Sequence, residues 1–116
     1  MWDSSSDTVT GKYSTLWIDL EQNRSLCEEL DNAGSWSTLI EPYIFAVGHN
    51  DDFIIAKQHP AENGKINFAV TNYYIVDITT AEAKVSGPHP EKAFEKLRKD
   101  IGAEKITFDQ LYPEHP

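Results

Sequence analysis

The side chains best suited to metal chemistry are the four histidines, and their spacing keeps them apart. His49 and His59 flank one predicted strand, which would separate them by about 33 Å at roughly 3.3 Å per residue. His89 precedes a predicted helix, and His115 lies near the last residue of the sequence. No HxxxH, HExxH or CxxC spacing occurs. We therefore expect no metal site.

The candidate nucleophiles are equally unpromising. Cys27, the single cysteine, is followed by Glu28 and Glu29, and nearby carboxylates raise the pKa of a thiol. We expect it to be a small buried core residue. No GxSxG motif and no glycine-rich phosphate loop occurs. Nineteen acids create many chance carboxylate pairs, so none indicates glycoside hydrolysis. We expect no catalytic residues and no cofactor, and that the protein is not an enzyme.

Acidic residues carry the clearest compositional pattern. The 116 residues hold 19 acids against 10 bases, a formal net charge of −9. Residues 1–62 hold eleven acids and three bases, whereas residues 63–116 hold eight and seven. This balance argues against direct binding of nucleic acid or of anionic lipid, which both need clustered Lys and Arg. The surplus is either a solvated face or a docking surface for a protein partner with a basic surface.

Three tryptophans lie outside any aliphatic run and suggest an exposed aromatic patch. Trp2 is in a polar segment, Trp17 is on the more polar face of the first predicted strand, and Trp36 is in a serine-rich loop. The alternative is that they pack beneath loops. The candidate partner-binding residues are therefore aromatic or acidic: Trp17, Asp19, Glu21, Trp36, Asp51 and Asp52.

Alternation and turn chemistry predict an antiparallel β-sheet of four to six strands. Residues 1–11 are predicted to be a flexible polar arm, and residues 12–116 a single α+β domain. Strands are expected over 12–20, 39–48, 52–59, 65–78 and 83–86. Residues 24–30 are either a return strand of a hairpin or a helical turn, and we favour the strand. In the first strand, the more aliphatic face should meet the core; its residues are Ser14, Leu16, Ile18 and Leu20. The apolar runs around residues 44–47 and 53–56 should be buried on both sides of the sheet.

One C-terminal α-helix is predicted over 90–101, packed on a face of the sheet. Pro90 suits its first turn and Gly102 its end. Ala93, Phe94 and Leu97 belong to its apolar stripe. No apolar run approaches the roughly 18 residues of a membrane helix, so we expect no membrane insertion of this chain.

An ordered series of segments resembles a group of small bacterial domains of unknown function that are described as lipoproteins. The resemblance covers about residues 40–100 and rests on Ile40-Glu41-Pro42, the stretch from Val47 to Gln58, Tyr73-Tyr74-Ile75-Val76-Asp77, Gly87-Pro88 and the stretch from Phe94 to Arg98. It implies a compact antiparallel domain without known catalytic residues, and an envelope anchor in full-length relatives. The beginning of this chain shows no export signal and no lipid-accepting cysteine.

These observations lead to two functional hypotheses. The first is a non-catalytic acidic binding protein, such as an immunity or inhibitor protein that captures a basic partner, for example a toxin. The likeness to immunity proteins is one of size and charge. The alternative is an envelope-tethered, lipoprotein-like domain with a structural or sensing role. The expected location is the cell envelope or periplasm if an export signal was removed, and otherwise the cytoplasm.

Overall fold

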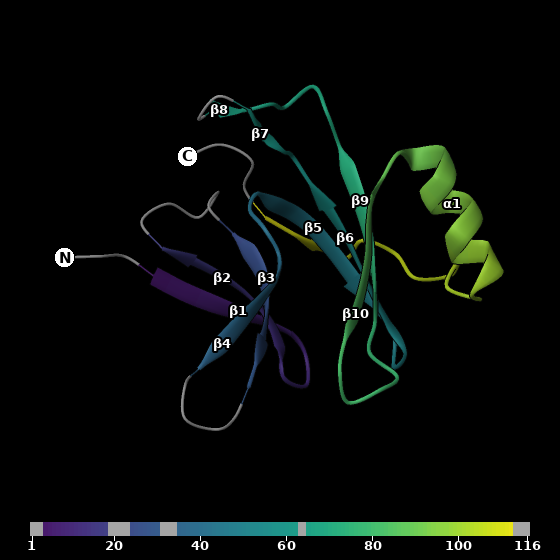
Figure 1. Ribbon diagram of the computed structural model, residues 1–116, viewed down its shortest axis with the longest axis horizontal. Helices are drawn as coiled ribbons and strands as arrows, with labels where there is room; N and C mark the ends of the chain where they lie inside the picture. The colour runs from purple at the N-terminus through teal and green to yellow at the C-terminus, as the bar shows by residue number, and fades with distance from the viewer. Residues whose placement is uncertain (1–3, 19–23, 31–34, 63–64, 113–116) are drawn as a thin grey trace.

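Two antiparallel sheets and one helix form three layers (Figure 1). The computed structural model describes residues 4–18, 24–30, 35–62 and 65–112. The four-stranded sheet has the order β1-β2-β3-β4, so each strand pairs with the next in the chain. Its strands are β1 (Ser4–Thr10), β2 (Tyr13–Ile18), β3 (Ser25–Glu29) and β4 (Trp36–Ile40).

The five-stranded sheet has the order β10-β9-β6-β5-β11 and forms the middle layer. Its strands are β5 (Ile44–His49), β6 (Phe53–Gln58), β9 (Asn72–Asp77), β10 (Lys84–His89) and β11 (Gln110–Leu111). A small hairpin of β7 (Ala61–Glu62) and β8 (Lys65–Ile66) projects beyond this sheet. The four-stranded sheet packs on one face of the five-stranded sheet, and helix α1 (Glu91–Asp100) packs on the opposite face. The predicted α+β class is confirmed, with more strands than expected.

The central strands β5 and β6 of the middle sheet are buried on both faces, as the apolar runs predicted. Ile54, Ile55 and Ala56 in β6 are all fully buried. Successive side chains of a strand point to opposite faces. Ile54 and Ala56 therefore join the core shared with the four-stranded sheet, whereas Ile55 packs in the cluster around Phe94 of α1.

The first two predicted segments differ from the structure. Residues 4–10, expected to belong to a flexible arm, form β1 and pair with β2. The predicted inner face of β2 is confirmed only in part, because Ser14 is buried, at 4% exposed, but so are both of its neighbours. Leu20 lies outside the described residues. Tyr13 and Thr15 are 5% and 0% exposed and face the core, whereas Leu16 is half-buried. The reason lies in Arg24, whose buried guanidinium donates a hydrogen bond to the Thr15 hydroxyl (2.9 Å). Buried polar groups need such partners, so Thr15 points inward.

The single strand predicted over 39–48 is two strands in two different sheets. β4 ends at Ile40 and β5 begins at Ile44, with Pro42 between them. Pro42 cannot donate a ladder hydrogen bond, and the chain crosses here from one sheet to the other. Residues 41–43 are thus the connection between the two layers.

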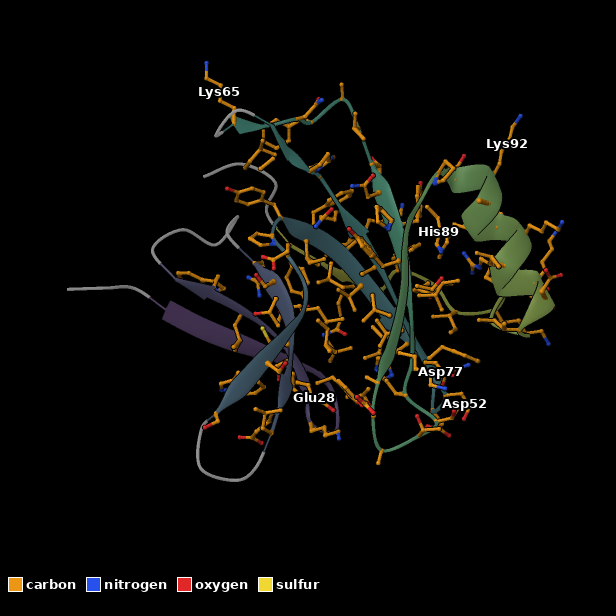
Figure 2. The ribbon with its side chains drawn as sticks, viewed as in Figure 1. Glu28, Asp52, Lys65, Asp77, His89 and Lys92 are labelled. Atoms are coloured by element: carbon orange, nitrogen blue, oxygen red, sulfur yellow. The ribbon has the colours of Figure 1, made fainter. Side chains whose placement is uncertain are left out.

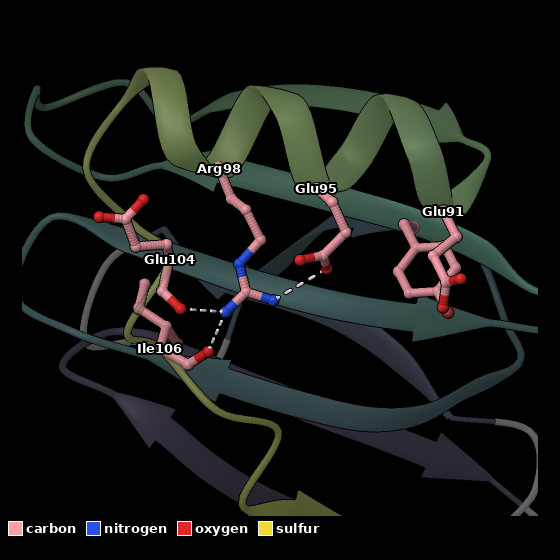
Figure 3. Close-up of polar contacts among 6 residues, drawn as sticks. Glu91, Glu95, Arg98, Glu104 and Ile106 are labelled. Carbon is pink, nitrogen blue, oxygen red and sulfur yellow. Dashed lines mark hydrogen bonds and ion pairs between the residues drawn. The ribbon is translucent and has the colours of Figure 1, made fainter.

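The segment after the helix is fastened by Arg98, which is 9% exposed (Figure 3). Its guanidinium donates hydrogen bonds to the backbone oxygens of Glu104 and Ile106 and pairs with Glu95 at 3.2 Å. Charge-assisted hydrogen bonds of this kind are about twice as strong as neutral ones. They hold the returning chain, residues 103–108, against the uncovered part of the middle sheet beside α1.

The returning chain passes so close to Gly48 of β5 that we expect no larger side chain to fit there. A Cβ at position 48 would lie 1.9 Å from the backbone oxygen of Thr107. Gly48→Ala should therefore lower the free energy of unfolding by about 2 kcal/mol, measured by urea denaturation. Gly102→Asn is the control, because Gly102 has φ +76° with open space around it and Asn tolerates that conformation. Equal midpoints for wild type and Gly48→Ala would contradict this packing.

Candidate functional site

Two loops bring acidic residues together at one end of the middle sheet. Asp51 and Asp52 lie in the turn between β5 and β6, where the Asn50 side chain accepts hydrogen bonds from the backbone N–H groups of Asp52 and Phe53, both at 2.8 Å. Asp77 ends β9 directly opposite Phe53. The backbone N–H of Ile78, the residue after β9, donates to the backbone oxygen of Asp52 at 2.9 Å.

We call this surface the acidic end and define it as Asp51, Asp52, Asp77 and Glu82. All but Asp77, which is half-buried, are exposed. Figure 2 shows Asp52 and Asp77 at the lower end of the molecule with Glu28, and Lys65 and Lys92 at the upper end.

A lysine ties the four-stranded sheet to the acidic end. Lys12 pairs with Glu28 at 2.8 Å and donates a second hydrogen bond to the backbone oxygen of Ala81, at 3.2 Å. The hydrogen bond to Glu28 raises the pKa of Lys12. Ala81 lies in the loop that carries Glu82, so this contact positions the loop between β9 and β10.

The carboxylate of Asp77 is held in place by two hydrogen bonds from one residue. Thr79 donates to it from both its hydroxyl (2.6 Å) and its backbone N–H (2.9 Å). These hydrogen bonds, with the nearby charge of Lys84, hold the pKa of Asp77 below its ordinary value of 3.8. Hydrogen bonds to the charged form favour that form, so Asp77 stays ionised in mild acid.

An apolar groove adjoins the acidic end and shares Asp77 with it. It encloses about 190 Å³ between the C-terminal half of α1 and the middle sheet. We define the apolar groove by its five apolar lining residues: Phe53, Ile75, Val85, Leu97 and Ile101. Val85 and Ile101 are large apolar side chains that remain 41% and 39% exposed. Asp77 and Lys84 lie at its polar margin.

The structure brings some of the predicted site residues together and separates others. Asp51 and Asp52 share the acidic end, whereas Trp17 and Trp36 lie apart and are both half-buried. β2 and β4 each run antiparallel to β3 between them. Trp17, near the end of β2, and Trp36, at the start of β4, therefore lie at opposite ends of the four-stranded sheet. Asp19 and Glu21 fall outside the described residues.

Sequence analysis missed Asp77, Glu82 and the apolar groove. The signal that could have found Asp77 was the pairing of two predicted strands, because residues opposite each other in antiparallel strands become neighbours. No short stretch of sequence predicts the groove, because its lining residues come from separate strands and the helix and meet only in the folded chain.

The described residues offer little reactive chemistry. Cys27 is buried, and burial raises its pKa, as does the nearby Glu41. The described ranges contain no group of three or more His, Cys, Asp or Glu that could hold a metal ion. Ser86 and His89 approach to 2.7 Å, but within those ranges no carboxylate orients the His89 ring. The arrangement is suited to electrostatic and apolar contact with another molecule.

Comparison with known proteins identifies the family and nothing finer. Residues 10–112 match the family described as "Protein of unknown function (DUF3997)". The chain belongs to this family of uncharacterised domains, as the resemblance to bacterial domains of unknown function had suggested. No curated protein and no solved structure matches the chain. In the part of the chain that the structure describes, no helix is long and apolar enough to cross a membrane.

The environment of Asp77 gives a prediction that can be measured by NMR. Thr79→Val removes the hydroxyl donor, so the pKa of Asp77 should rise toward 3.8 without reaching it, because the backbone N–H and Lys84 remain. A carboxyl ¹³C titration measures it. Since the folded-state pKa is lowered, Asp77 stabilises the fold above its unfolded pKa and loses this contribution as pH falls through the folded value.

Thr80→Val is the matched control for this titration, because the Thr80 hydroxyl donates to the Glu82 backbone and not to Asp77. Equal pKa values of Asp77 in all three proteins would show that Thr79 does not hold the carboxylate.

Proposed function

We propose that this protein is a non-catalytic acidic binding protein that captures a protein partner with a basic surface. The observation that carries this proposal is the acidic end, where Asp51, Asp52 and Glu82 are exposed beside Asp77. Such a concentration of charge attracts an oppositely charged surface and accelerates its association. An immunity or inhibitor role, in which the partner is a basic toxin, is the specific form of this proposal.

The family match leaves this proposal open, because the family is described as one of unknown function. Its support comes from the net charge of −9 and from the position of the acids on two adjoining loops. Both loops join strands of the middle sheet. Their backbones are therefore already ordered, and binding costs little further conformational entropy.

Neutralising the two turn acids tests the proposal. Asp51→Asn/Asp52→Asn should weaken binding of a captured basic protein at least about tenfold at low salt, because each buried or rim charge pair contributes to association. The partner is isolated by affinity capture from a lysate, and its affinity is then measured by calorimetry over a range of salt concentrations. Wild-type affinity should fall steeply with salt, and the variant should show a shallower dependence.

Glu41→Gln/Glu91→Gln is the matched control, since it removes the same amount of charge away from the acidic end. Glu41 lies between β4 and β5, and Gln at position 91 can still accept the hydrogen bond that Tyr73 donates to Glu91. A partner whose affinity is equal in all three proteins at every salt concentration would refute capture through the acidic end.

The alternative proposal is an envelope-tethered, lipoprotein-like domain with a structural or sensing role. Its support is the resemblance of residues 40–100 to domains described as lipoproteins. The product of the native gene should then be found in the membrane fraction of the cell and carry a lipid, as shown by labelling with a radioactive fatty acid. A native product that is found unlabelled in the soluble fraction would exclude the tether.

A further inference from the structure

The apolar groove lies beside a free strand edge. β10 is the last strand of the five-stranded sheet, and no described strand pairs with its outer side. Lys84, Val85 and Ser86 pair regularly with β9. The register then shifts before His89, and Pro88 has no N–H group to donate. A bulge and a proline protect a sheet edge from unwanted pairing, so only residues 84–86 remain able to accept another strand.

The accessible part of the edge coincides with the apolar groove. Lys84, Val85 and Ser86 all line it. The side chains of Lys84 and Ser86 lie on the groove face, opposite Asp77 and Ile75, whereas Val85 pairs with Val76 of the other core. Ile101 and Leu97 of the helix segment form the facing wall. An extended segment that adds to a sheet edge places alternate side chains on the same face. One of those side chains can enter the groove while the backbone pairs with residues 84–86. This combination is the usual basis of recognition by strand addition.

Charge at the end of the apolar groove indicates what kind of segment fits. Asp77 lines the groove and belongs to the acidic end, and Asp52 lies beside it. Lys84 is the basic neighbour that offsets Asp77, whereas Asp51, Asp52 and Glu82 are exposed to solvent. A segment with an apolar anchor followed or preceded by Lys or Arg complements both features.

We infer that residues 84–86 of β10 and the apolar groove take up an extended segment of the basic partner, with one apolar side chain in the groove and flanking Lys or Arg at the acidic end. The inference rests on the proposed function and adds the shape of the ligand. Capture of a folded basic surface by charge alone would leave the groove empty.

A second copy of this chain is the competing occupant. Lys92, Lys96 and Lys99 lie on one exposed face of α1, opposite the buried Phe94. That basic face could approach the acidic end of another molecule. A helix surface, however, cannot pair with a strand edge, so this contact would not use residues 84–86.

The probe is a displayed library of short random peptides, selected against the full chain. Selected sequences should alternate apolar residues with Lys or Arg. Binding of one such synthetic peptide should slow hydrogen exchange of those amides of residues 84–86 that point away from β9, because the free edge becomes paired. Peptides that bind without protecting these amides, or failure to select any peptide, would overturn the inference.

Variants of the apolar groove separate this inference from the proposed function. Leu97→Ala and Ile101→Ser should each weaken the peptide about tenfold without changing the salt dependence, because they remove anchor contacts and no charge. Leu111→Ser is the matched control, since Leu111 is 73% exposed and lies on β11, away from the groove. Urea midpoints of the variants close to that of the wild type establish that they are folded.

Comparison of the charge variant with the groove variants separates the two proposals. If Asp51→Asn/Asp52→Asn weakens the peptide but the groove variants do not, charge capture stands and the groove inference fails. If the groove variants act and the charge variant does not, the groove binds its segment and the proposed acidic capture fails. A concentration-dependent dimer that Ile101→Ser abolishes would assign the groove to a second copy and overturn the inference.

Discussion

Burial of the central strands of the five-stranded sheet on both faces is the constraint on which the rest of this structure depends. β6 supplies apolar side chains to both cores, with Ile54 on one side and Ile55 on the other, each fully buried. Backbone groups in such a layer have no access to water, so pairing with β5 and β9 must be nearly complete. The four-stranded sheet and α1 exclude water from the two faces of these strands.

A buried amide at the end of β6 fixes the segment that connects the two sheets. The Gln58 side chain donates hydrogen bonds to the backbone oxygens of Glu41 and Pro42, at 2.8 and 3.2 Å, and accepts them from Asn72 and Tyr74. All four of its strong hydrogen-bonding positions are thereby used. The connection between the sheets is fixed at this end, and the turns that carry the acidic end lie at the opposite end of β6.

Local patterns predicted the helix and most strands, and they failed where a distant partner decided the outcome. The apolar stripe around Phe94 predicted a helix over 90–101, and α1 occupies Glu91–Asp100. The inward face of β2 could not be predicted, because Thr15 is buried to meet Arg24, nine positions along the chain. The acidic turn at Asp51 and Asp52 was visible in the sequence. Asp77 joins it only through the pairing of β6 with β9, a non-local contact that no single window contains.

The central claim is that a basic partner binds where the acidic end meets the apolar groove. The most direct measurement is an NMR titration of the isotope-labelled protein with the captured partner, followed amide by amide. The account predicts chemical-shift changes concentrated in residues 50–53, 77–86 and 97–101. Changes centred on the outer face of the four-stranded sheet or on the lysine face of α1, with these segments unaffected, would contradict it.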